Sequence, residues 1–196
     1  MAPFGPSRPR LLVVGLAPGK HGANRTGRPF TGDFAGVLLY ETLHRYGFAS
    51  RAVSRSAGDG LRLIGCRITN AVKCVPPANR PLPSEVRTCN RYLAEEIQSL
   101  PPGAVILALG TVAHAAVLMA LGLKRAAYRF GHGVRYQLPH GLMLFDSYHC
   151  SRYNTQTRRL TPDGFGKVVA AIRDYLSCPK PTSAARPAPR SGRTGS

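Results

Sequence analysis

A buried strand followed by a long glycine-rich loop is the feature that most limits how this chain can fold. Residues 11–14 read LLVV, an apolar run typical of a strand inside a sheet. Residues 15–33 read GLAPGKHGANRTGRPFTGD, and glycines let such a backbone approach a ligand closely or adopt positive φ. We expect a helix to begin near Asp33. Strand, loop and helix together predict a ligand site of the α/β type.

The loop combines positive charge, an aromatic ring and a carboxylate. Lys20, Arg25 and Arg28 suit phosphate, Phe30 offers a surface for stacking, and Asp33 is the only carboxylate. The spacing excludes a P-loop, which requires Gly-Lys-Ser/Thr, and also the G-x-G-x-x-G dinucleotide fingerprint.

The chain carries a large excess of positive charge. Lys and Arg number 27 against 9 Asp and Glu, which gives a formal net charge of +18. Only four of these cations follow Cys178, so the basicity belongs to the folded part. Such an excess favours a polyanionic partner such as nucleic acid, although an arginine-rich proteome would produce the same imbalance.

Cysteine usage and hydropathy indicate the compartment. The 5 cysteines are scattered and odd in number, unlike a secreted disulfide framework. No run approaches the roughly 18 apolar residues of a membrane span, and the N-terminus lacks the apolar core of an export signal. We therefore expect a cytoplasmic protein with no membrane partner, and a monomer.

Strands and helices alternate along the chain. We expect strands at 11–14, 61–72, 104–109 and 142–145, helices at 33–46, 84–100, 111–121 and 162–176, and a hairpin at 128–138. This order predicts an α/β fold with three α/β/α layers and a central, mostly parallel four-stranded sheet. Residues 1–177 form one domain, and residues 178–196 form a basic, disordered tail.

Three polar clusters follow predicted strands, at residues 15–33, 70–79 and 147–154. In an open parallel sheet, ligands bind outside the carboxyl ends of the strands. The three clusters are therefore predicted to form one active site.

These clusters resemble, in order, three motifs of the family 5 uracil-DNA glycosylases. Residues 15–33 resemble the first motif. Residues 69–81 (TNAVKCVPPANRP) are similar to a block shared by families 4 and 5, and residues 147–157 (SYHCSRYNTQT) look like their third motif. The resemblance covers residues 11 to about 176. It implies excision of uracil and other deaminated bases from DNA by N-glycosidic cleavage, which leaves an abasic site.

The resemblance also implies a pocket for a base flipped out of the duplex. Phe30 would stack on the base and Asn70 would bind its edge, with Gly15, Ala17 and Gly19 completing the base-binding set. Alternatively, Phe30 belongs to the core under the loop, and Asn70 only forms a turn at the strand end.

His149, Asp33 and Asn79 are the predicted catalytic residues. A neutral His149 would donate to O2 of the base and stabilise the leaving anion. Asp33 would position water or support the sugar cation, and Asn79 would orient water or the sugar. The alternatives are a structural histidine, a helix cap at Asp33 and an ordinary loop residue at Asn79.

Small residues in the first motif predict the substrate range. Ala17 lies where many uracil-DNA glycosylases carry a carboxylate or amide that activates water, and where family 5 carries alanine. Gly19 and Gly22 replace bulkier groups that crowd the C5 edge of the base in related families. We therefore expect a roomy pocket that accepts hydroxymethyluracil, hypoxanthine or xanthine as well as uracil.

Basic and aromatic side chains near the motifs are predicted to contact double-stranded DNA. Arg152 and Tyr153 would enter the duplex where the base leaves, unless they are merely exposed. The predicted phosphate contacts are Lys20, Arg25, Arg28, Lys73 and Arg80.

Cys74 and Cys89 match two of the four cysteines that bind a [4Fe-4S] cluster in families 4 and 5. Such a cluster needs four thiolates. The family's other two form a C-x-x-C before the first strand, and the ten residues before the first strand here contain no cysteine. We therefore assign this chain only two of the expected ligands.

Two other functions are compatible with parts of the pattern. A catalytically silent nucleic-acid-binding module on the same fold would explain the alanine at position 17 and the missing cysteines. A nucleotide-phosphate hydrolase would use the glycine-rich loop, but the chain lacks the paired carboxylates that hold magnesium.

Overall fold

The computed structural model describes residues 1–178, apart from the side chain of Asn79. The predicted tail therefore lies outside the described residues from residue 179 onward. The strands are β1 (Leu11–Gly15), β2 (Cys66–Asn70), β3 (Val105–Leu109), β4 (Arg135–Gln137) and β5 (Met143–Ser147). They form one sheet in the order β2-β1-β3-β5-β4.

The sheet contains one strand more than the four predicted. β1, β2, β3 and β5 are parallel to their neighbours, whereas β4 is an antiparallel edge strand paired with β5. The predicted hairpin within residues 128–138 is wrong, because β4 pairs with β5 through the turn η3 (Pro139–Gly141). The three residues of β4 are partly or fully exposed, so no run of buried apolar residues reveals this strand in the sequence.

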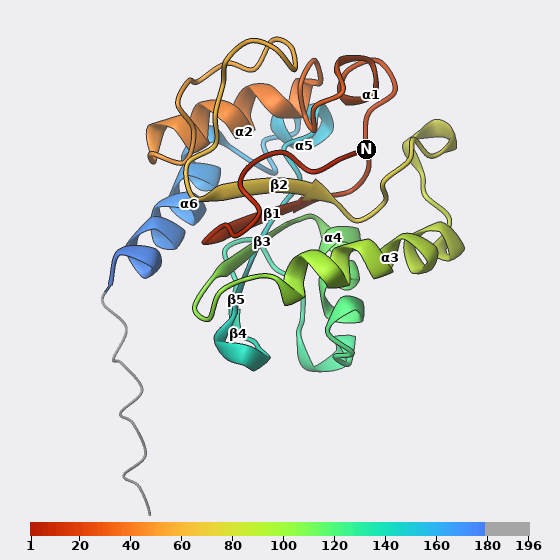
Figure 1. Ribbon diagram of the computed structural model, residues 1–196, viewed down its shortest axis with the longest axis vertical. Helices are drawn as coiled ribbons and strands as arrows, with labels where there is room; N and C mark the ends of the chain where they lie inside the picture. Colours follow the sequence, from red (N-terminus) through yellow and green to blue (C-terminus); the bar gives the residue numbers. More distant parts are fainter. Residues whose placement is uncertain (179–196) are drawn as a thin grey trace, which may run out of the picture.

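Helices cover both faces of the sheet, as expected for parallel strands buried on two sides (Figure 1). α2 (Phe34–Arg45) and α6 (Pro162–Ser177) pack on one face against Leu11 and Val13. α3 (Pro83–Gln98) and α4 (Thr111–Ala120) pack on the other face against Leu12 and Val14. Alternate residues of β1 thus belong to two separate cores, and the predicted three-layer architecture is confirmed.

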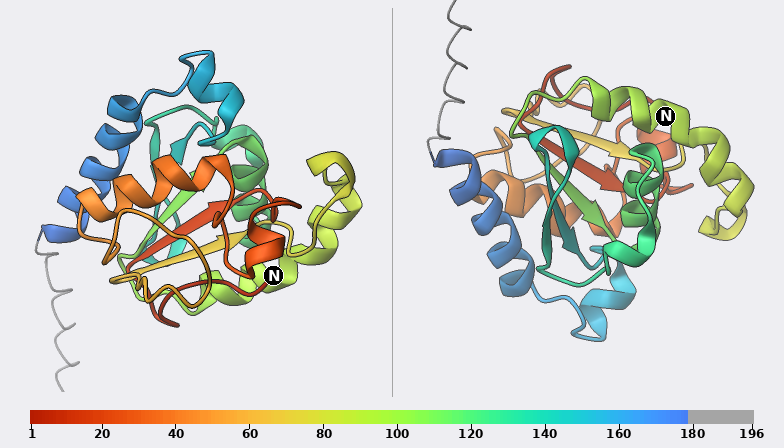
Figure 2. Two further views of the ribbon diagram at one scale, coloured as in Figure 1. Left: turned by 90° about the horizontal axis from the view of Figure 1, so that it is seen from above. Right: turned by 90° about the horizontal axis from the view of Figure 1, so that it is seen from below.

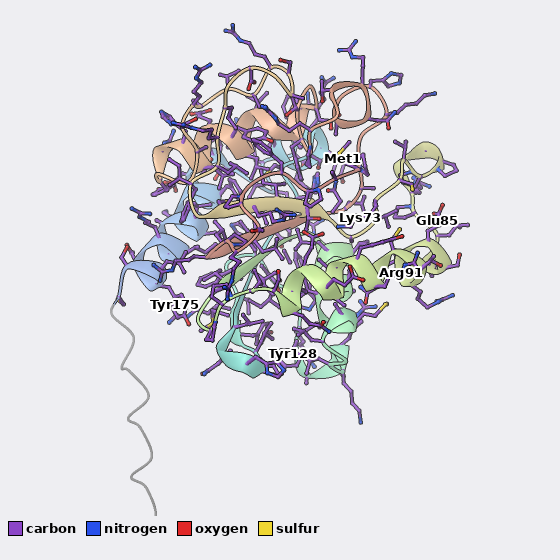
Figure 3. All side chains as sticks on the ribbon, viewed as in Figure 1. Met1, Lys73, Glu85, Arg91, Tyr128 and Tyr175 are labelled. Atoms are coloured by element: carbon purple, nitrogen blue, oxygen red, sulfur yellow. The ribbon has the colours of Figure 1, made fainter. Side chains whose placement is uncertain are left out.

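Short elements complete the fold. They are α1 (Ala23–Thr26), α5 (Arg152–Gln156), η1 (Pro77–Asn79) and η2 (Arg125–Ala127). The N-terminal residues run beside β2, where Phe4 forms an antiparallel bridge with Ile68. The amino group of Met1 donates to the carbonyl of Lys73, and Figure 3 shows the two residues side by side. Among the described residues, no helix has both the length and the hydropathy needed to cross a bilayer.

A buried histidine–aspartate pair fixes α4 to β5. His114 Nδ1 lies 2.8 Å from Asp146 Oδ1, and His114 Nε2 lies 3.0 Å from the carbonyl oxygen of Tyr128. Both ring nitrogens of His114 face oxygen atoms. The two hydrogen bonds form together only when the His114–Asp146 pair carries two protons, one in each hydrogen bond. Burial lowers the pKa of His114, but the hydrogen bond and charge of Asp146 outweigh it and leave the pKa raised. Burial raises the pKa of Asp146, and the hydrogen bond with His114 offsets this shift only in part.

We predict that His114→Ala lowers the free energy of unfolding by about 3 kcal/mol, because it leaves the Asp146 carboxyl buried without its partner. Urea denaturation measures this loss. Lys167→Ala is the control, since it breaks the exposed pair with Asp163 and should leave the urea denaturation midpoint almost unchanged. The stabilisation by His114 is complete below its unfolded pKa near 6.5 and is lost as pH rises through the raised folded pKa. Equal losses in the two variants would contradict the prediction.

Candidate active site

The three predicted polar clusters meet at one edge of the sheet. Gly15 is in register with Asn70 on the neighbouring strand, and Leu109 is in register with Ser147. All these residues are at carboxyl ends of parallel strands, which point to the same edge in the two views of Figure 2. The loop after β1, the segment after β2 and the segment after β5 are therefore neighbours, as the sequence predicted.

Phe30 lies at the centre of this edge in an uncommon backbone conformation. Its φ is +61°, in the left-handed region, and only 6% of the residue is exposed. A Cβ at Gly36 would lie 1.9 Å from the Phe30 carbonyl oxygen, so α2 can approach this turn only with glycine there. The Tyr40 hydroxyl donates to the carbonyl oxygen of Pro29 at 2.7 Å. Close packing and this hydrogen bond thus hold the turn in place.

The ring of Phe30 connects the other two principal site residues. It stacks on His149 with 5.8 Å between centroids and 27° between planes. A Cβ at Gly15 would lie 2.6 Å from both Phe30 Cζ and Asn70 Oδ1, so Gly15 makes room for both side chains. Asn70 Oδ1 is buried and has no hydrogen-bond partner among the described residues. An unsatisfied buried oxygen at this position is suited to accept a hydrogen bond from a ligand.

A cavity of about 440 Å³ opens beside these residues, within the size range of small-molecule sites. Six predicted residues line it, whereas Asn70 and Gly15, which lie close to the Phe30 ring, are not part of the lining. The cavity is lined by Leu16, Ala17, Gly19, Phe30, Asp33, Phe34, Ala35, His149, Ser151 and Arg152. Sequence reasoning did not single out the other four: Leu16 and Ser151 lie within the quoted motifs, whereas Phe34 and Ala35 directly follow the first motif.

Asp33 occupies the N-cap position of α2, but its carboxylate does not cap that helix. Oδ2 accepts a hydrogen bond from the Ala23 N–H at 3.1 Å, across the glycine-rich loop. A Cβ at Gly19 or Gly22 would lie 2.3 or 2.1 Å from Asp33 Oδ1. The space beside these two glycines is therefore filled by the Asp33 carboxylate, which differs from the expectation that both glycines simply enlarge the base pocket.

His149 follows β5 and lines the cavity. The side chain of Asn154 donates to the His149 carbonyl oxygen at 2.8 Å and holds this part of the chain. No described group hydrogen-bonds to the imidazole ring. Burial lowers the pKa of His149 to about 4, so the ring is neutral at pH 7 and one nitrogen carries a proton that it can donate. Asn154 was part of the quoted motif, but nothing in the sequence separated this supporting role from the rest.

Two of the cations predicted to contact phosphates, Arg28 and Lys73, form ion pairs within the protein. Arg28 is 4% exposed, and its guanidinium binds Asp59 Oδ1 at 2.8 Å, Ser54 Oγ at 2.9 Å and the carbonyl of Ala57 at 2.7 Å. Lys73 Nζ lies 2.6 Å from Glu96 Oε1. The other predicted DNA contacts are exposed and remain available: Lys20, Arg25, Arg80, Arg152 and Tyr153.

Asp59, the carboxylate that pairs with Arg28, accepts several further hydrogen bonds. Burial alone would raise the pKa of Asp59, but donors from Leu61, Arg28, Arg55 and Ser56 lower it well below its usual range. The Arg28 guanidinium also lies 4.4 Å above the centre of the Phe4 ring. Arg28 therefore connects the Phe30 turn to residues 54–59 and to the N-terminal segment. Its position in the motif did not distinguish this structural role from phosphate binding.

The cysteines of the structure do not form a metal site. Cys74 is exposed and Cys89 is half-buried. Among the described residues, no group of three or more His, Cys, Asp or Glu side chains is arranged to hold a metal ion. Two thiols are too few for a [4Fe-4S] cluster, so the described residues alone do not fit this group.

Comparison with known proteins identifies the family. The sequence model of the "Uracil DNA glycosylase superfamily" matches residues 2–173, and the chain belongs to this superfamily. It is 50% identical over 166 residues to the type-5 uracil-DNA glycosylase of Thermus thermophilus, covering 85% of this chain and 75% of the relative. It is 47% identical over 161 residues to the type-5 enzyme of Mycobacterium bovis, covering 81% of this chain and 60% of the relative.

A solved structure agrees with the fold. The crystal structure of wild-type Pedobacter heparinus SMUG2 superimposes with a TM-score of 0.50 at 15% identity, covering 87% of this chain and 76% of that chain. At this identity the similarity concerns the fold alone. The family predicted from the three motifs is thus confirmed by the sequence comparisons.

We predict that His149 titrates near pH 4 and not near the ordinary histidine value of 6.5. NMR of the imidazole C–H protons measures this midpoint, with His149→Gln to assign the resonance. Because the pKa of His149 is lower in the folded state, the contribution of His149 to the free energy of unfolding is complete above the unfolded pKa of 6.5. This contribution is lost as the pH falls toward 4. A midpoint near 6.5 would contradict the burial described here.

Proposed function

We propose that this protein is a monofunctional DNA glycosylase that excises uracil from DNA. The observation that carries the proposal is the stacked pair of Phe30 and a neutral His149 in the wall of one cavity, with the unsatisfied amide oxygen of Asn70 close by, in a member of this superfamily. Relatives at 47% and 50% identity are named type-5 uracil-DNA glycosylases, which supports this activity. The chain spans 60% of one of these relatives and 75% of the other.

In the proposed reaction, the bond between C1′ of the deoxyribose and N1 of uracil breaks, and its electron pair leaves with the base. Water then adds to C1′, and a proton is released. His149, neutral and without another hydrogen-bond partner among the described groups, donates to O2 of the departing base and stabilises its negative charge. The Asp33 carboxylate supports positive charge on the sugar or positions water.

Base recognition is assigned to Phe30 and Asn70. The ring of Phe30 provides an apolar surface for the flipped base. The free Oδ1 of Asn70 suits the N3–H donor of uracil. Asn79, whose backbone ends η1 at the same edge of the sheet, is proposed to orient water or the sugar.

The proposed partner is double-stranded DNA, bound by a monomer in the cytoplasm. The net charge of +18 supports a polyanionic partner. The five cysteines are free thiols, which suits a reducing compartment. A [4Fe-4S] cluster would need two thiolates besides Cys74 and Cys89, and no step of the proposed reaction depends on it.

We predict that His149→Ala lowers kcat about 10²- to 10³-fold with little change in KM, because the lost hydrogen bond forms mainly in the transition state. The assay uses duplex DNA with one uracil and measures alkali-labile strand breaks. His44→Gln is the control, because His44 is exposed on α2 and does not line the cavity. Binding of DNA without any base release by the unaltered protein would contradict the proposal and favour a silent binding module.

We also predict that the protein excises hydroxymethyluracil, hypoxanthine or xanthine as well as uracil. The cavity of about 440 Å³ supports this range. Duplexes that each carry one of these bases are compared at equal enzyme concentration, with thymine as the control base. Excision of uracil alone would contradict the prediction.

A further inference from the structure

A second groove adjoins the candidate base cavity. It has a volume of about 570 Å³ and shares Phe30, Asp33, Phe34 and Arg152 with that cavity. Its remaining walls come from Gly32, from Gly36, Val37 and Glu41 of α2, and from residues 52–54. A ligand in the cavity and a ligand in the groove would therefore be separated only by shared side chains.

The groove exposes apolar side chains in an unusual concentration. Phe34 is 43% exposed, Val37 66% and Val53 58%. The Arg152 guanidinium lies 5.1 Å above the centre of the Phe34 ring and adds a flat cationic surface beside it. Apolar and guanidinium surfaces of this kind stack well on a nucleic-acid base.

Charge around the groove favours a nucleic-acid strand. Arg51 and Arg55 are exposed on either side of Val53, and the Arg51 guanidinium also donates to the carbonyl oxygen of Asp59 at 2.6 Å. The carboxylate of Glu41 in the groove wall is paired with Arg45 at 3.1 Å. Arginines beside exposed apolar side chains suit a nucleic-acid strand, in which arginines contact phosphates and flat or apolar surfaces contact bases.

Hydrogen bonds also connect the groove to the turn that carries Phe30. Ser54 Oγ lies 2.6 Å from Thr31 Oγ1 and accepts a hydrogen bond from Arg28 at 2.9 Å. Thr31 and Arg28 flank the turn that carries Phe30. Residues 52–54 are thus fixed relative to the ring that is proposed to stack on the excised base.

We propose that this groove binds the base next to the excised one in the same DNA strand. Phe34, Val37 and Val53 contact that base, and Arg51 and Arg55 contact the adjoining phosphates. A volume of about 570 Å³ suits a single nucleoside, whereas a protein partner needs an interface of about 800 Å² on each side. The inference rests on the proposed function, because it requires a flipped base in the neighbouring cavity.

The test compares the double variant Val37→Ser/Val53→Ser with the unaltered protein on three duplexes. Each contains one uracil, and in two of them the base on the 5′ or the 3′ side is replaced by baseless tetrahydrofuran. We expect the double variant to lose about 10-fold in kcat/KM on the intact duplex, since it removes the apolar surface that contacts the neighbouring base. On the duplex that lacks the base bound in the groove, the double variant and the unaltered protein should have kcat/KM values that agree within about 2-fold. Ile64→Ser is the matched control, because Ile64 is 56% exposed but does not line the groove.

The outcomes separate the alternatives. Full activity of the double variant on the intact duplex overturns the proposal and leaves the groove to another occupant, such as a protein partner. An equal loss on all three duplexes also overturns it, because the substitutions then act on the structure and not on the neighbouring base. Thermal unfolding of each variant identifies such damage. Failure of the unaltered protein to release uracil contradicts the proposed function itself, independently of the groove.

Discussion

The left-handed backbone at Phe30 is the constraint on which the candidate site depends. A non-glycine residue in this conformation costs roughly 1–2 kcal/mol. It persists here because Gly36 allows α2 to pack on the Phe30 carbonyl, Tyr40 binds the Pro29 carbonyl, and Arg28 is anchored on Asp59. These contacts direct the ring toward His149 and Asn70. Backbone strain at a ligand site is common, because the surrounding fold over-determines the geometry.

Burial lowers the pKa of both His114 and His149, but only His114 has a carboxylate partner that reverses the shift. His114 faces the Asp146 carboxylate, so its pKa is raised and it stabilises the junction of α4 and β5. His149 follows Asp146 by three residues but faces no carboxylate, and burial lowers its pKa to about 4. The first histidine is therefore structural, and the second is a neutral donor. The partner of each ring determines its role, and burial alone does not.

The basic residues likewise divide into two groups with different functions. Arg28 and Lys73 are paired with Asp59 and Glu96 inside the protein, where they fix loops around the site. Arg51, Arg55 and Arg152 are exposed and their side chains have no carboxylate partner among the described residues, and Arg152 lines both the cavity and the groove. The positive charge of this protein therefore serves both the fold and the approach to a polyanion.

The sequence by itself determined the family, the alternation of strands and helices, and the meeting of three polar clusters at one sheet edge. These follow from local patterns, since buried parallel strands are continuous apolar runs and their carboxyl ends necessarily align. Only the tertiary structure decided that Arg28 is buried, that Asp33 fills the space beside Gly19 and Gly22, that β4 joins the sheet, and that a groove adjoins the cavity. Each of these depends on a partner distant in sequence, such as Asp59 for Arg28, and no local pattern specifies which distant residue will be in contact.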